Sequence, residues 1–81
     1  MLHELKTWPR EYSAVLTGQK NFEYRKADRP FQVHDRLKLF EWDPKKEKYT
    51  GRFTLVRVTY LLREGFGIPE GYCIMSIKLI Q

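Results

Sequence analysis

The sequence predicts a small, mostly-β domain of the α+β class: a partly closed barrel of about five strands with one main helix packed over it. Only one segment shows the apolar spacing of a helix, while several others alternate apolar and polar residues between glycines and prolines. Closing the sheet removes exposed edges from so few strands. With 81 residues, the chain is expected to form a single domain, residues 1–81, around one modest core.

The helix is predicted over residues 8–17, near the N-terminus. Its apolar residues recur at positions i, i+4, i+7 and i+8, namely Trp8, Tyr12, Val15 and Leu16. Thr7 is expected to be the N-cap, Pro9 suits the first turn, and Gly18 supplies a left-handed stop. Residues 2–6, before the helix, are expected to form a short strand.

Alternation with a period of two predicts the remaining strands. They are expected at residues 21–26, 36–42, 52–62 and 72–80. In the third of these, the phase of the alternation changes between Leu55 and Val56, which predicts a β-bulge or a barrel corner. Residues 45–50 are expected to form a charged hairpin loop closed by Gly51, and the glycine-rich residues 65–71 an irregular loop.

The charge balance favours an anionic partner. Fifteen Lys and Arg residues against ten Asp and Glu residues give a net charge of +5, and such cations displace the counterions that phosphates hold. Solubility alone is the alternative reason for a basic surface. No apolar stretch approaches the roughly 20 residues of a membrane span, and no secretory leader is visible. With a single cysteine and two histidines, we expect no disulfide, metal or cofactor, and a cytoplasmic location.

The densest polar cluster is residues 18–26, directly after the predicted helix. In a strand, Asn21, Glu23 and Arg25 project together, with Lys20 at the mouth of the strand. One interpretation is a solvated face with a weak Glu23–Arg25 pair contributing about 0–1 kcal/mol. The other is a binding site, because Lys20 and Arg25 suit phosphate. Glu23 would then orient one of these cations or accept a hydrogen bond from a base amino group.

Aromatic side chains offer surfaces on which an unpaired base can stack, at about 1–3 kcal/mol each. The candidates are Trp8, Tyr24, Phe40 and Trp42. For Trp8 and Phe22, packing in the core is the preferred interpretation because of their patterned positions. His3 and His34 are expected on the surface or in turns rather than as metal ligands, and Cys73 is expected to be a buried apolar residue.

A longer pattern resembles a known family. It consists of Lys6, Trp8-Pro9, Gly18-x-Lys20-x-x-Glu23-x-Arg25, Phe31-x-Val33-x-Asp35, Glu41-Trp42 and Gly71-Tyr72. In this order the residues resemble the ASCH domains of the PUA-like superfamily, closest to a small bacterial and phage branch. The resemblance implies a PUA-like β-barrel with a helix over a cleft lined by Lys20, Glu23 and Arg25, and a role in recognising RNA or modified nucleotides. Relatives usually carry glycine at the position of His34, so a left-handed backbone there would be strained.

We therefore expect a nucleic-acid-binding module, for RNA more than DNA, without a membrane or metal partner. Its binding residues are expected to be Lys6, Lys20, Glu23, Arg25, Lys26, Arg29 and Trp42. One alternative is a small hydrolase acting on modified nucleosides, with Lys20 and Glu23 as an acid/base pair. Glu23 stands where some ASCH-type members have a threonine nucleophile, and the pair lacks an orienting third group, so catalysis is less expected than binding. A protein-interaction accessory factor, using the loop at 66–68, is the other alternative.

Overall fold

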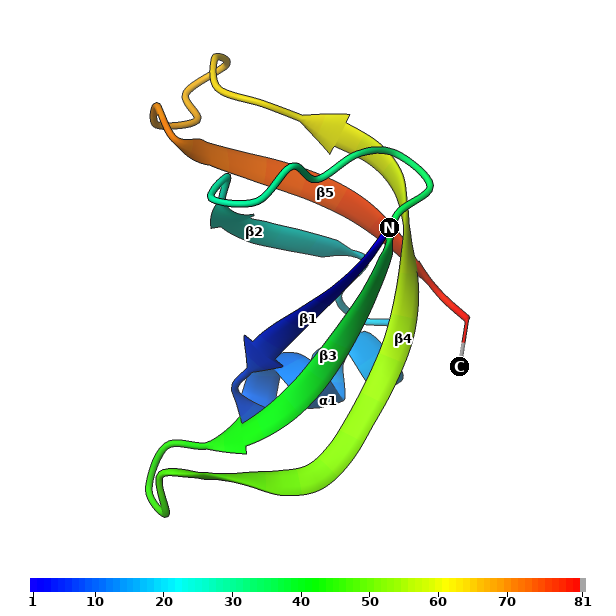
Figure 1. Ribbon diagram of the computed structural model, residues 1–81, viewed down its shortest axis with the longest axis vertical. Helices are drawn as coiled ribbons and strands as arrows, with labels where there is room; N and C mark the ends of the chain where they lie inside the picture. Colours follow the sequence, from blue (N-terminus) through cyan, green and yellow to red (C-terminus); the bar gives the residue numbers. More distant parts are fainter. Residues whose placement is uncertain (81) are drawn as a thin grey trace.

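The computed structural model describes residues 1–80, which form one sheet of five strands and one short helix (Figure 1). In chain order the elements are β1 (Leu2–Thr7), α1 (Pro9–Leu16), β2 (Phe22–Lys26), β3 (Arg36–Asp43), β4 (Lys48–Leu62) and β5 (Tyr72–Leu79). The prediction of a mostly-β fold with five strands and one helix is confirmed. Within residues 1–80, no helix combines the length and apolar character needed to cross a bilayer.

The sheet is curled into a half-barrel. Its strand order is β1-β3-β4-β5-β2, with β1 parallel to β3 and every other neighbouring pair antiparallel. The two edge strands, β1 and β2, border the open side of the curl, at the left of Figure 1. We call the region between these two edges the seam. The barrel is therefore partly closed, as predicted, and the seam is the place where closure stops.

The core fills the concave side of the sheet. Its buried members are Leu5, Val15, Phe31, Leu37, Leu39, Val56, Val58, Cys73, Met75 and Ile77. Helix α1 contributes Val15 and the buried Tyr12, and the connection between β2 and β3 contributes Phe31, which is only 1% exposed. Each fully buried side chain of this size contributes about 1.5–3 kcal/mol, so the helix and the connection are both fixed against the sheet.

Strand β4 changes the face that it turns toward the core. The inward series runs through Val56 and Val58, and after a register shift between Val58 and Tyr60 it resumes at Leu61. A bulge of this kind bends a strand and increases its twist, which lets one long strand follow the curl. The predicted phase change between Leu55 and Val56 is wrong, because Thr54, Val56 and Val58 are buried in one continuous alternation. The bulge expected in this strand lies instead between Val58 and Tyr60.

The ends of the helix and the hairpin turn differ in part from the prediction. Helix α1 begins at Pro9 with Trp8 as N-cap and without a side-chain cap, so the prediction that Thr7 caps the helix is wrong, since Thr7 is the last residue of β1. Gly18, with φ of 80°, confirms the left-handed stop. The hairpin turn between β3 and β4 comprises only residues 44–47, because the residues after it already belong to β4.

His34 has φ of 80°, the conformation that the resemblance to a glycine-bearing family implies. Its N–H donates a hydrogen bond to the Val58 carbonyl at 2.8 Å, and the Val58 N–H donates to the Asp35 carbonyl at 2.8 Å. The left-handed residue therefore turns the chain into β3 while pairing it with β4. A side chain in this region carries strain that glycine avoids.

Asp35 joins the start of β3 to the start of β1. Its Oδ1 accepts from the Met1 amino group at 3.0 Å, and its Oδ2 lies 2.8 Å from His3 Nε2 and accepts from the Gln32 N–H at 3.0 Å. Burial opposes the charge on Asp35, but these hydrogen bonds outweigh it and hold the pKa of Asp35 below its usual value. His3 is 4% exposed, so the prediction of a surface position for His3 is wrong.

Candidate functional site

A cleft of about 730 Å³ opens at the seam, between β1, the first turn of α1, β2 and the connection that follows β2. A volume of this size accommodates a nucleotide or a similar small ligand. Its cationic lining residues are Lys6, Arg10, Lys20, Arg25, Lys26 and Arg29. The carboxylates that line it are Glu11, Glu23 and Asp28. Lys6 lines the cleft but its Nζ lies over the Trp42 ring outside it, so the other five cations stand against three carboxylates and the cleft favours an anionic ligand.

Strand β2 turns a carboxylate inward and aromatic rings outward. Glu23 is only 2% exposed, whereas Phe22 and Tyr24, on the opposite face, are 48% and 50% exposed. The alternation predicted for this strand is confirmed, but the interpretation of Glu23 as part of a solvated face is wrong, and so is core packing for Phe22. No further strand or helix of the described residues 1–80 covers this outer face, as the exposure of both rings shows.

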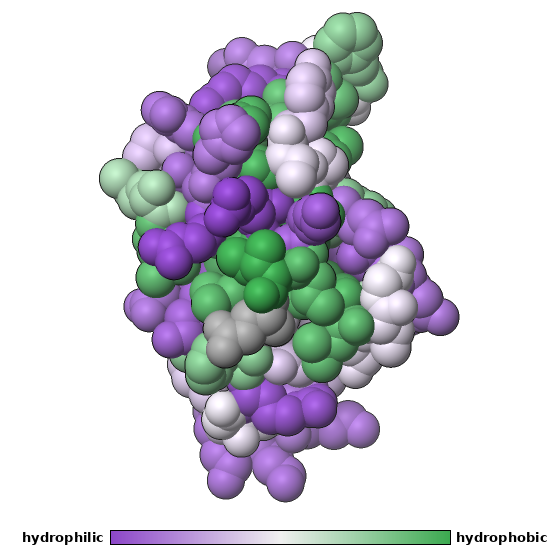
Figure 2. Space-filling model, turned by 90° about the vertical axis from the view of Figure 1, so that its right-hand side faces the viewer, coloured by the Kyte–Doolittle hydropathy of each residue, from purple (hydrophilic) through white to green (hydrophobic). Residues whose placement is uncertain are grey.

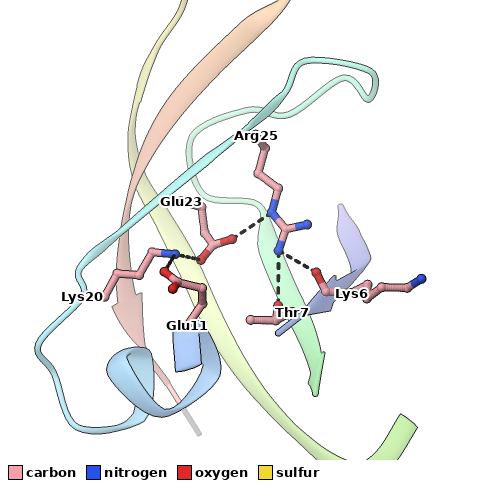
Figure 3. A network of polar contacts seen from close by, with 6 residues as sticks. All are labelled: Lys6, Thr7, Glu11, Lys20, Glu23 and Arg25. Carbon is pink, nitrogen blue, oxygen red and sulfur yellow. Dashed lines mark hydrogen bonds and ion pairs between the residues drawn. The ribbon is translucent and has the colours of Figure 1, made fainter. Parts of the chain in front are cut away.

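Arg25 bridges the seam. Its Nε donates to Glu23 Oε1 at 2.8 Å, and its Nη2 donates to the Lys6 carbonyl at 3.0 Å and to Thr7 Oγ1 at 3.2 Å (Figure 3). The carbonyl belongs to the edge strand β1. One guanidinium therefore links β2 to β1 where the backbone ladder stops, and its fork is fully oriented by three acceptors.

Lys20 lies between two carboxylates. Its Nζ donates to Glu11 Oε1 at 2.9 Å and lies 3.6 Å from Glu23 Oε2. The hydrogen bond and the charge of Lys20 lower the pKa of Glu11. The Lys20 N–H also donates to the Ala14 carbonyl at 2.9 Å, so the end of α1 holds the lysine backbone in position. Glu11 is the orienting third group that the sequence did not reveal.

The second oxygen of Glu23 has no hydrogen-bond partner. Oε2 is buried and accepts no hydrogen bond from any of the described residues 1–80. The nearest cation, Lys20 Nζ at 3.6 Å, is attracted to Oε2 but is too distant for a hydrogen bond. Buried polar atoms in proteins are nearly always hydrogen-bonded. In Figure 3 the Glu23 carboxylate lies between Lys20 and Arg25, with Oε2 turned toward Lys20 and Oε1 toward Arg25.

The residues predicted to bind nucleic acid divide into two groups. Six of the seven line the cleft: Lys6, Lys20, Glu23, Arg25, Lys26 and Arg29. Trp42 does not line it; its ring lies 4.1 Å from Lys6 Nζ, on the outer face of the sheet. Within residues 1–80, the side chains of Lys26 and Arg29 make no hydrogen bond or ion pair, so their charges are available to a ligand.

Sequence reasoning missed part of the lining. Trp8 is 59% exposed and lines the cleft, so core packing for Trp8 is wrong. As the N-cap of α1 it sits at the junction with β1, where helical periodicity no longer describes the direction of a side chain. Arg10 and Asp28 also line the cleft. Arg10 lies close after the first strand, and this position could have indicated that it lines the cleft. No pattern in the sequence indicates the same for Asp28.

Another buried carboxylate, Glu41 of β3, lies outside the cleft. Arg52 donates to both of its oxygens, Nε to Oε1 and Nη2 to Oε2, each at 2.9 Å, and the Thr50 hydroxyl donates to Oε1 at 2.7 Å. The hydrogen bond from Arg52 lowers the pKa of Glu41 and raises that of Arg52. This pair has its acceptors filled, and we assign it to holding β3 and β4 together.

The fold and the cleft together define a small β-rich half-barrel domain with a cation-rich cleft at its seam. Residues 2–77 match a family model described as "Domain of unknown function (DUF3850)", and the chain belongs to that family. It is also similar to the "Uncharacterized 12.9 kDa protein in GpA 3'region" of Escherichia phage P2, with 38% identity over 58 residues. That match covers 72% of this chain and 51% of the phage protein, so the chain spans about half the length of this curated relative.

Proposed function

We propose that the seam cleft binds unpaired nucleotides of a single-stranded nucleic acid, RNA more than DNA, or a modified nucleotide. The proposal rests on the buried Oε2 of Glu23, which accepts no hydrogen bond from residues 1–80 and lies beside Lys20 in a cation-rich cleft. Cations alone would suit any anion. A carboxylate among them disfavours a bare phosphate and favours a ligand with both negative charge and an N–H donor. A nucleotide has both, through its phosphate and its base.

The cleft offers a separate group for each part of a nucleotide. Lys26 and Arg29 have free charges for phosphate, and the two-pronged guanidinium is suited to it. Glu23 accepts from the base. Trp8, which is 59% exposed, lines the cleft and provides a stacking surface, and Tyr24, 50% exposed on the outer face of β2, provides a second one at the rim. The resemblance to ASCH domains and a cytoplasmic location belong to this proposal, since both fit a protein that meets intracellular RNA.

A titration at several salt concentrations tests the proposal. A fluorescent single-stranded RNA trimer is expected to bind more tightly than about 100 μM at low salt. Contacts to the two phosphates that link a trimer would make log affinity fall with log salt at a slope near −1.4, at about 0.7 for each contact. Changing Lys26 and Arg29 to glutamine should reduce that slope by about 1.4. Absence of trimer binding at low salt would remove the proposal.

Hydrolysis of a modified nucleoside is a second candidate, because the structure brings Lys20 and Glu23 together with Glu11 as an orienting group. Such a triad can position an acid and a base around one ligand. Incubation of the protein with N-acylated nucleosides, followed by chromatography, distinguishes the two functions. Turnover that is lost in Lys20→Ala would favour hydrolysis, whereas binding without turnover would leave recognition as the function.

A further inference from the structure

The convex face of the sheet carries cations that the cleft does not use. Arg36 of β3 lies directly opposite Arg57 of β4, and Arg57 lies directly opposite Lys78 of β5. All three are exposed. Because neighbouring strands are about 4.8 Å apart, these residues form a continuous line across three strands. We call Arg36, Arg57 and Lys78 the cation row.

Folding alone does not favour the cation row. Like charges directly opposite one another on adjacent strands destabilise a sheet. Within residues 1–80, the three side chains make no hydrogen bond or ion pair that would offset the repulsion. A carboxylate on the same outer face, Glu4, lies in a different register position, opposite Lys38. An anionic partner laid along the row would relieve this repulsion.

Aromatic rings lie beside the cation row on the same sheet. Lys38 Nζ lies 4.3 Å from the ring of Phe53 and 5.1 Å from that of Phe40. The Phe40 and Phe53 rings are 5.8 Å apart, and those of Trp42 and Tyr49 are 5.0 Å apart. We call Phe40, Trp42, Tyr49 and Phe53 the aromatic strip.

Figure 2 views the molecule from the side of the sheet at the right of Figure 1. A band of strongly hydrophilic side chains crosses it above a hydrophobic cluster. Leu79 and Ile80, which are 43% and 42% exposed, lie at the C-terminal end of β5. The face therefore places charge and apolar surface side by side.

We propose that this face binds the part of a single strand that leaves the cleft, with phosphates along the cation row and bases on the aromatic strip. Lys6 connects the two surfaces, because it lines the cleft while its Nζ lies 4.1 Å from the Trp42 ring. Cations interleaved with π-faces suit a polyanion whose monomers stack. An acidic peptide would match the charges but would leave the rings without stacking partners. The proposal extends the proposed function but stands on separate residues.

A matched pair of triple variants tests this inference. One variant changes every member of the cation row to glutamine; the other changes Lys45, Lys46 and Lys48, which are exposed around the β3–β4 turn, and removes the same net charge. Both are titrated with fluorescent uridine oligonucleotides of three and twelve residues. The wild type is expected to bind the 12-mer at least about tenfold more tightly than the trimer.

The cation-row variant should lose that advantage, and its salt slope for the 12-mer should fall by about 2, or about 0.7 for each cation. Its trimer affinity should not change. The turn variant should keep the length advantage. An equal loss in both variants, or an unchanged 12-mer affinity in the cation-row variant, would overturn the inference. Binding of the 12-mer without any trimer binding would instead refute the cleft proposal and leave this one standing.

Two further measurements distinguish nucleic-acid binding by the cation row from a structural role and from binding of a different polyanion. The cation-row variant should melt at the same temperature as the wild type or higher, because it loses repulsion between like charges; a lower melting temperature would assign the row a structural role and overturn the inference. Binding of phosphatidylserine vesicles or poly-glutamate that depends on the row, without binding of the 12-mer, would also overturn it. Failure of both to compete with the 12-mer supports it.

Discussion

Buried carboxylates in two regions of the half-barrel have opposite hydrogen-bonding states. On β3 and directly before it, Asp35 and Glu41 accept hydrogen bonds on both of their oxygens. On β2, Glu23 is equally buried, but one of its oxygens accepts none from residues 1–80. Strand β3 lies inside the sheet, where neighbours supply donors, and β2 lies at the seam. The difference separates carboxylates whose oxygens are both used by the fold from one that has an oxygen without a hydrogen bond.

Asp35→Ala should give the largest loss of stability. It leaves His3, which is 4% exposed, and the Gln32 N–H without their acceptor, and it removes the side-chain link between the starts of β1 and β3. Leaving a buried polar group without its hydrogen-bond partner costs about 1–3 kcal/mol. Urea denaturation followed by circular dichroism measures the change in the free energy of unfolding. A loss below about 1 kcal/mol would show that Asp35 is not a structural carboxylate.

Glu41→Gln should destabilise the fold by less, about 1 kcal/mol. The amide keeps one acceptor for Thr50 or Arg52 but loses the charge, and Arg52 is half-exposed, so solvent replaces part of the interaction. The same denaturation experiment measures it, with Lys46→Gln as a surface control. Nucleic-acid affinity should not change, since Glu41 lies outside the cleft.

Lowering the pH should reduce the contribution of Asp35 and Glu41 to the free energy of unfolding. The pKa values of Asp35 and Glu41 are lowered in the folded protein, so their contribution to stability is complete above the ordinary carboxyl pKa of about 4. It is lost as the pH falls below that value and through the lower folded pKa. Comparison of urea midpoints at about pH 6 and pH 3 tests this, and the decrease should be smaller in Asp35→Asn than in the wild type.

Glu23→Gln should have the smallest effect on stability, within about 0.5 kcal/mol, because the amide oxygen can still accept from Arg25, and Lys20 keeps its hydrogen bond to Glu11. Its effect on binding should be larger, about tenfold weaker for an RNA trimer, which corresponds to about 1.4 kcal/mol. Fluorescence titration and denaturation of the same preparation give both values. A stability loss as large as that of Asp35→Ala, with unchanged binding, would reverse the comparison.

Local sequence patterns predicted most of the helix and strands, but few of the contacts between residues that are far apart in the sequence. Leu37 and Leu39 alternate with polar residues on an interior strand, and both are fully buried, as expected. The contact between His3 and Asp35 spans 32 positions, and no local rule indicates it. On β2, the preference of apolar side chains for the core would turn Phe22 inward. In the structure Phe22 lies on the uncovered outer face of β2 and Glu23 lies inward. The direction of Glu23 therefore depended on a tertiary feature that the sequence does not display.

The strand order has a consequence for when the cleft can exist. Strand β2 is made early, yet its hydrogen-bonded neighbour is β5, about 50 positions later in the chain. The hairpin of β3 and β4 can form from local contacts, whereas β2 must wait for the last strand, and such distant pairing is slow. A nascent chain that still lacks residues 72–79 thus carries the cleft residues of β2 without the strand that pairs with β2. The cleft can therefore assemble only after β5 has been synthesised.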